Sequence, residues 1–414
     1  MSTPSLPHPL RTRSFRLLFA GRCLSMLGDA VVPAALSLAV YMATGSTADL
    51  ALVLGCAMLP RLLLLPVGGV AGDRFNARTV ALTTDCVRCA TQLFVGVELL
   101  GGDPRLWQIA LAEALGGAAS AFAMPALAPL LTGTVEEENR RRANALMGVV
   151  NSTTRVAGPT LAGVLILTAG PGWAFVLDSA SFAASALLLS AIRVRHVPPE
   201  RRSLVADLKE GWGEVRSRDW YWSSLIAHSA WNGAAAVLLT LGPAIAFQEF
   251  DGKGFWLAFL QTGAVGLLLG SVLAGRARPR RPILTANLGL ATYALPLTLL
   301  AVSAPAPLAI AAYGIAQAGL GFLSPVWETS VQSAIPAHTL ARVTSYDWLL
   351  SLAAAPVGYA LAPVAADAWG AEVPLLAAAV LVGGACLATT LAPGVRHFGR
   401  PAPEEAPALS TTAA

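Results

Sequence analysis

The chain has 414 residues, of which 55% are hydrophobic and only 13% are charged, and its formal net charge is +4. Soluble domains usually carry about 25% charged residues, so this composition excludes a water-soluble fold for much of the chain and indicates that lipid is its solvent. Nucleic acid binding is not expected, because the arginines are spread over the ends of apolar runs and form no single basic patch.

Twelve apolar segments, each about 20 residues or longer, predict transmembrane helices. In chain order they cover residues 15–42, 48–72, 79–100, 106–131, 140–168, 173–192, 221–247, 255–276, 282–303, 307–334, 341–366 and 372–392. A polar stretch at 193–219 divides them into six and six, and its second part is expected to form an amphipathic helix.

These segments predict an all-α membrane protein made of two six-helix bundles, residues 15–192 and 220–392. A cytoplasmic tail at 1–14 precedes the first bundle, the connector at 193–219 joins the two, and a Pro/Ala/Thr-rich tail at 393–414 is expected to be disordered. No cleavable signal peptide is expected, because the first apolar run is too long for one.

Arginine and lysine are distributed unequally between the two sets of loops. If the N-terminus is cytoplasmic, only Arg105 and Lys253 fall in outside loops, whereas every inside segment carries arginine. The positive-inside rule therefore predicts that both termini are cytoplasmic and that the chain crosses the plasma membrane an even number of times.

The two halves share landmarks in the same order. The fourth span reads F-A-M-P at Pro125, and the tenth reads F-L-S-P at Pro325; the second and eighth spans both end in Ala-Gly before an arginine-bearing loop. Such a duplication is typical of transporters in which two bundles rock about a central site.

The segment from Gly68 to Arg78, G-G-V-A-G-D-R-F-N-A-R, resembles the loop signature G-x-x-x-D-R-x-G-R-R/K of the major facilitator superfamily. Asn76 stands where the signature has glycine, and asparagine reaches the left-handed conformation more readily than most residues. In that family this loop is a gate latch close to the start of helix eleven. The resemblance therefore implies gate roles for Gly69, Gly72, Asp73, Arg74, Arg78, Arg342 and Asp347.

The fifth span contains R-V-A-G-P-T-L-A-G, which partly resembles the family's antiporter signature at Gly158, Pro159 and Gly163. The stretches FRLLFAGRCLSMLGDA, PALAPLL and AFVLDSASF are most similar to the drug and siderophore exporter branch, which includes the enterobactin-exporter group. The resemblance implies the twelve-helix fold and proton-coupled export of a small molecule.

Ionisable residues within spans are hypotheses for function, since charge inside a membrane is costly. Asp29 in the first span and Arg61 in the second are equidistant from the turn near Gly45, which predicts a buried pair that either couples protons or is static. Asp85 and Arg88, three residues apart, are expected to pair locally.

Glu113 and Arg155 are also matched in depth and make a second candidate pair, while Asp178 is placed nearer the outer face. Three tryptophans deep in the second half could line a cavity for an aromatic substrate, although lipid-facing packing is the favoured explanation for each of them: Trp231, Trp327 and Trp348.

The sequence contains no G-x-x-x-x-G-K-[ST] loop, no H-E-x-x-H and no G-x-S-x-G. We therefore predict a proton-coupled exporter that acts as a monomer on a small lipophilic or aromatic molecule and is not an enzyme. No cofactor, metal, nucleotide or nucleic acid is expected. The alternatives are a uniporter, an uptake symporter, or a sensor or scaffold derived from a transporter.

Overall fold

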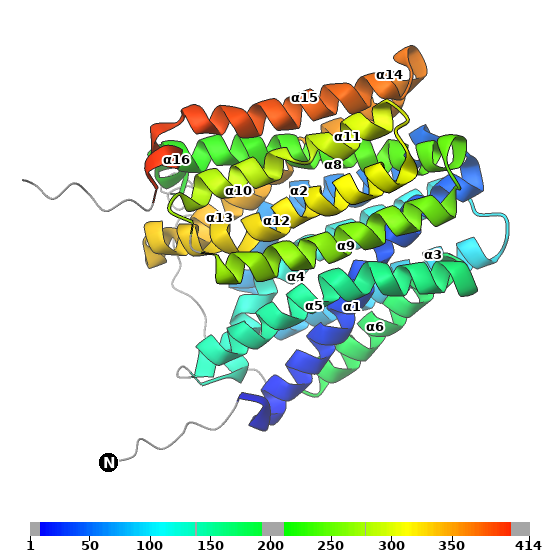
Figure 1. Ribbon diagram of the computed structural model, residues 1–414. Coiled ribbons are helices and arrows are strands. Elements are labelled where there is room, and N and C mark those ends of the chain that lie inside the picture. Colours follow the sequence, from blue (N-terminus) through cyan, green and yellow to red (C-terminus); the bar gives the residue numbers. More distant parts are fainter. Residues whose placement is uncertain (1–8, 137–138, 193–210, 278, 399–414) are drawn as a thin grey trace, which may run out of the picture.

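A computed structural model describes residues 9–136, 139–192, 211–277 and 279–398, and every regular element in these ranges is a helix (Figure 1). The predicted tail at 1–14, the connector at 193–219 and the tail at 393–414 lie largely outside these residues. The short helix η1 covers Pro9–Arg11, and residues 211–216 of the connector are helical.

The N-terminal half contains six long helices. They are α1 (Arg13–Thr44), α2 (Thr47–Arg74), α3 (Ala77–Leu100), α4 (Leu106–Thr134), α5 (Arg140–Thr168) and α6 (Gly172–Ser190). Each coincides with one predicted span, because an apolar segment in lipid must satisfy its backbone hydrogen bonds internally.

The C-terminal half repeats this plan with two of its spans divided. It contains α8 (Asp219–Glu249), α9 (Lys253–Arg276), α10 (Pro282–Ala291), α11 (Ala294–Ala301), α12 (Ala306–Ala334), α13 (Ala337–Leu352), α14 (Ala355–Trp369), α15 (Glu372–Ala388), η3 (Thr389–Leu391) and α16 (Pro393–His397). The ninth predicted span is divided into α10 and α11, and the eleventh into α13 and α14.

Eleven helices of the described chain are long and apolar enough to cross a membrane. The remaining predicted span is α5, of which only Ala157–Thr168 forms an apolar stretch. Its first half is rich in arginine and asparagine, and part of that half lines a cavity.

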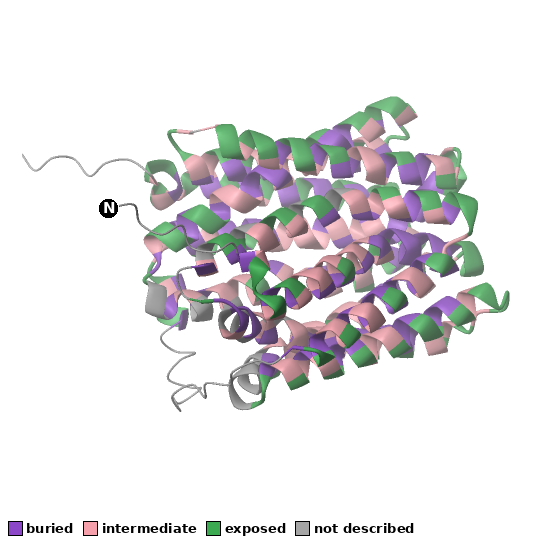
Figure 2. Cartoon of the chain, turned by 90° about the horizontal axis from the view of Figure 1, so that it is seen from below, coloured by how far each residue is buried: buried purple, intermediate pink, exposed green. Residues whose placement is uncertain are grey.

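The outer surface of the helices is largely apolar. Exposed residues run along the outside of the bundle (Figure 2), and they include Leu63, Leu187 and Val380. An exposed apolar surface of this extent suits contact with lipid acyl chains.

The two halves use equivalent close helix pairs. In the first half α2 packs on α4, where a side chain at Gly117 would overlap the Ala57 carbonyl; in the second half α9 packs on α12, where one at Gly270 would overlap the Ala318 carbonyl. Small residues allow backbones to approach closely in membranes. These are the second and fourth helices of each half, as an internal repeat requires.

We call the end of the molecule that carries the start of α1, the α4–α5 turn and α16 the arginine-bearing end (Figure 1). The predicted disordered tail begins too early, because residues 393–397 form α16 at this end. The Gly394 amide donates a hydrogen bond to Asp219 at the start of α8 (2.8 Å), which fixes α16 to the bundle.

Candidate functional site

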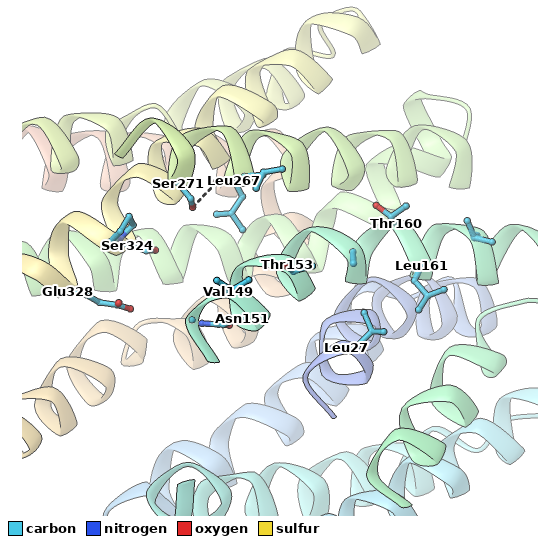
Figure 3. A pocket seen from close by; sticks show the side chains of 15 residues that line it. Leu27, Val149, Asn151, Thr153, Thr160, Leu161, Leu267, Ser271, Ser324 and Glu328 are labelled. Carbon is cyan, nitrogen blue, oxygen red and sulfur yellow. Dashed lines mark hydrogen bonds between the residues drawn. The ribbon is translucent and has the colours of Figure 1, made fainter. Parts of the chain in front are cut away.

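A cavity of about 980 Å³ lies between the two halves. Its walls come from α1 and α5 on one side and from α9 and α12 on the other, and Figure 3 shows their side chains directed into the same space. The volume suits a drug-sized ligand, since small-molecule pockets usually measure about 300–1,000 Å³.

The lining is mostly apolar with a few polar groups. Leu27, Leu161 and Leu267 give it apolar walls; the polar and charged members among the described lining residues are Asn151, Thr153, Thr160, Ser271, Ser324 and Glu328. Glu328 is the charged member of this described set of lining residues.

Beside the cavity, inside the N-terminal half, Asp29 of α1 forms an ion pair with Arg88 of α3. The guanidinium donates to both carboxylate oxygens, one of them at 3.3 Å, and its carbon lies 4.0 Å from the centre of the Phe182 ring. The Arg88 side chain is 14% exposed and that of Asp29 39% exposed. Water can therefore reach the carboxylate more easily than its partner.

Two further carboxyl groups are buried near this pair. Asp178 of α6 is fully buried and accepts a hydrogen bond from Ser181 at 3.4 Å, while Glu113 of α4 is 5% exposed and accepts one from Gln92 at 3.4 Å. Both interact electrostatically with Arg88. Buried carboxyl groups that share one cation are suited to hold and release a proton.

Glycines bring the helices together around this cluster. A side chain at Gly28 would overlap the Asp178 carboxylate and the Ser181 hydroxyl. The close approach of α1 to α6 is therefore possible only because Gly28 has no side chain. A side chain at Gly158 would collide with Ala30 of α1. The antiporter-like motif therefore brings α5 against α1 next to Asp29.

The predicted charge pairs differ from those observed. Asp29 bonds to Arg88 and not to Arg61, although Arg61 lies within electrostatic range of Asp29. Arg88 therefore does not use its carboxylate neighbour Asp85 as its ion-pair partner. The predicted partner of Glu113, the side chain of Arg155, lies outside the described part of the structure.

Most of the predicted gate-loop side chains also fall outside the described residues: Gly69, Gly72, Asp73, Arg74 and Arg342. Arg78 is described, and its guanidinium donates to the Leu189 carbonyl (3.0 Å) and to the Ser190 carbonyl at the end of α6. Arg78 thus caps the carboxyl end of a helix in its own half, and both of these bonds stay within that half.

Asp347, predicted as a gate residue, is bonded inside the C-terminal half. It accepts hydrogen bonds from the Tyr221 hydroxyl (3.0 Å), the Trp327 indole (2.6 Å) and the Ser351 hydroxyl (3.2 Å). These three neutral donors tie α8, α12 and α13 together. The observed contacts fit a structural role within one bundle.

The three predicted cavity tryptophans are absent from the described cavity lining. Trp327 packs against His228 (4.7 Å between ring centroids) and Trp231 against Tyr293 (4.9 Å), both within the C-terminal half. Trp348 is 42% exposed. Helix rotation decides which face of α8 and α12 meets the cavity, and depth along the chain does not reveal it.

The sequence predicts the role of two contributors incompletely. Arg88 was assigned to a local pair, and Gln261 of α9 was passed over, although an amide in the apolar run F-L-Q-T-G is a signal that sequence reasoning could have used. Gln261 contacts Pro159 and Thr160 of α5 across the two halves.

Comparison with known proteins agrees with this geometry. Residues 18–351 match the family described as the Major Facilitator Superfamily. The chain belongs to this superfamily. It is therefore a multi-pass membrane transport protein of the major facilitator fold, and not an enzyme.

Several relatives of this superfamily member carry names that refer to efflux. The chain is 25% identical over 383 residues to the multidrug efflux pump Tap of Mycolicibacterium fortuitum, covering 89% of this chain and 92% of Tap. It is 20% identical over 364 residues to macrolide efflux protein A of Streptococcus pyogenes (86% and 90% covered). An uncharacterized MFS-type transporter of Bacillus subtilis (strain 168), YfiS, is 26% identical over 346 residues (79% and 80% covered).

Solved transporter structures share the fold. A POT family transporter in complex with 5-aminolevulinic acid superposes with a TM-score of 0.71 at 12% identity, covering 93% of this chain and 97% of that one. A bacterial homolog of the human lysosomal transporter Spinster, in an inward-facing and unoccupied conformation, gives 0.70 at 15% identity (97% and 100% covered). At such identities the likeness concerns the fold alone.

Proposed function

We propose that this major facilitator protein exports a lipophilic or aromatic small molecule that carries positive charge, by proton antiport and alternating access. The observation that carries the proposal is the apolar cavity between the halves with Glu328 as its only charged described lining residue. An apolar cation gains both from burial of its apolar surface and from the carboxylate. Anionic substrates, including acidic siderophores, are disfavoured.

Proton coupling is assigned to the cluster around Arg88. Asp29 and Arg88 are held together as an ion pair with Asp178 and Glu113 buried nearby. Protonation of Asp29 would remove its attraction for Arg88, which would then be free to interact with Asp178. Because α1 carries both Asp29 and the cavity residue Leu27, a change at the pair can move the cavity wall.

The relatives support export as the direction of transport. All three relatives named above are transporters by name, and two of them are named as efflux proteins. We further propose that the arginine-bearing end faces the cytoplasm of a plasma membrane, as the positive-inside rule predicts. The cavity would then load from the cytoplasm or the inner leaflet.

Inside-out vesicles with an acidic interior test the proposal. A panel of lipophilic amines, neutral aromatic compounds and catecholate siderophores is added, and proton release is followed with a pH-sensitive dye. Native protein should release protons with the amines, and Asp29→Asn should not. Asp49→Asn is the matched control, because Asp49 lies in the first turn of α2 away from the cluster.

Two results would contradict the proposal. Accumulation of the amines without proton release would indicate a uniporter and remove the antiport step. Proton release by Asp29→Asn at the native rate would make the Asp29–Arg88 pair a static structural contact.

A further inference from the structure

One side chain of α9 holds the two halves together beside the cavity. The Thr160 hydroxyl of α5 donates to Gln261 Oε1 at 2.9 Å, and Gln261 Nε2 donates to the Pro159 carbonyl. A Cβ atom at Gly163, one turn further along α5, would lie 2.9 Å from Gln261 Nε2. The Pro/Gly motif of α5 is therefore shaped to receive this amide from the other half.

A second contact between the halves lies nearer the start of α9. The Trp256 indole donates to the Ser37 hydroxyl of α1 at 3.3 Å, and both side chains are buried. Gly242 of α8 leaves the space that the indole ring occupies. Both contacts lie toward the end opposite the arginine-bearing end, so they join the two halves at that end.

The two contacts differ in their access to substrate. Thr160 lines the cavity and is exposed to it (Figure 3), whereas Ser37 and Trp256 are not among the described lining residues. A ligand in the cavity can thus reach the hydroxyl that bonds to Gln261. A hydroxyl group has one proton to donate, so a ligand that accepts it takes it away from Gln261 Oε1.

We propose that Gln261 is a latch between the halves and that a substrate with a hydrogen-bond acceptor releases it by accepting the hydrogen bond that the Thr160 hydroxyl otherwise donates to Gln261. This inference rests on the proposed export function and adds a requirement to the substrate: an acceptor such as a ketone, ester or ether oxygen beside its apolar body. Gln261 is a positioning residue, because it acts on the substrate through Thr160.

The size of the effect follows from hydrogen bonding in membranes. One hydrogen bond between membrane helices shifts an equilibrium roughly threefold, and an amide held by two bonds roughly tenfold. A closed state held by these contacts should therefore open several times more often when Gln261 is removed. Substrate binding should produce the smaller, roughly threefold change in the native chain, because it removes the Thr160 bond and leaves the bond from Gln261 Nε2 to the Pro159 carbonyl.

The test measures how often the contact between α5 and α9 opens. Leu257, one turn before Gln261 on α9, is 5% exposed and lies against Gly163. Leu257→Cys is introduced into the full chain after the five native cysteines are replaced by serine. Its reaction with a membrane-impermeant maleimide is timed from the outer side of intact cells.

Three variants and two compounds are compared. Gln261→Leu and Thr160→Val should each raise the basal labelling rate roughly three- to tenfold. The matched control Gln317→Leu should leave it unchanged, because Gln317 bonds to Tyr313 inside the C-terminal half. Erythromycin, a basic macrolide rich in acceptors, should raise labelling of the otherwise native chain; tetraphenylphosphonium, a cation without an acceptor, should not.

If Gln261→Leu is labelled at the same basal rate as the otherwise native chain, the latch proposal is wrong. If the two compounds raise the labelling rate equally, the proposal that substrate releases the latch through Thr160 is wrong. These results are separable from failure of the export proposal. Raised labelling in Gln261→Leu together with no proton release in vesicles would leave the latch in place and remove proton antiport.

Discussion

Removal of Arg88 should destabilise the protein more than removal of its partner. Arg88→Gln leaves Asp29 without its ion-pair partner, removes the cation that interacts with Asp178, and removes the contact with the Phe182 ring. Breaking a buried pair in this way costs about 3–5 kcal/mol. Because the Asp29 side chain is 39% exposed, we expect a value near the lower limit, about 3 kcal/mol.

Asp29→Asn should cost less, about 1–2 kcal/mol, because Arg88 still has Asp178 and Asp85 within electrostatic range. The double variant Asp29→Asn/Arg88→Gln should be more stable than the sum of the two single changes predicts, by at least about 1 kcal/mol. The free energy of unfolding is measured by titrating the purified protein in mixed micelles with sodium dodecyl sulfate.

A surface pair provides the matched control. Arg218 and Glu214 are four residues apart near the start of α8, and their side chains are 24% and 27% exposed. Their coupling energy should be only about 0.3–0.5 kcal/mol. Additivity of the Asp29 and Arg88 changes within about 0.5 kcal/mol would show that the pair is not energetically coupled and would refute this reasoning.

Three further outcomes are expected. Gly28→Ala should lower the free energy of unfolding by about 1–3 kcal/mol, because the added methyl group overlaps α6. Gly55→Ala, whose added methyl group meets open space, should leave it unchanged. Equal stability of the two variants would contradict the packing of α1 on α6. Glu328→Gln should reduce export of cationic compounds roughly tenfold or more and spare neutral ones, measured in the vesicle assay. Trp256→Phe should lose the bond to Ser37 and raise basal maleimide labelling roughly threefold; labelling that instead slows would argue against a closing contact.

The sequence was sufficient to place the helices. Each apolar run became one helix or two consecutive helices, because lipid offers the backbone no hydrogen-bonding partner. In α5, polar residues in the sequence mark the half that lines the cavity. The resemblance at Asp73 and Arg74 correctly indicated the superfamily, and residues 18–351 match it. The sequence also revealed that Asp29, Glu113 and Asp178 lie within spans.

The partners of those residues depended on tertiary structure. Position in a helix gives the depth of a side chain in the membrane, so Arg61 looked suitable for Asp29. It does not give the direction in which the side chain points around the helix axis. Packing of α1 on α5 and α6, permitted by Gly28 and Gly158, turns Asp29 toward Arg88 of α3.

Contacts between the two halves were likewise not predictable from the sequence. The Pro159 motif was visible in the sequence, but its partner Gln261 is 102 residues away in a different bundle. Only the docking of α5 against α9 brings them into hydrogen-bonding range and encloses the cavity beside them. Local sequence determines which segments span the lipid, whereas contacts between distant helices decide which polar groups meet, because each contact depends on the rotation and tilt of two helices at once.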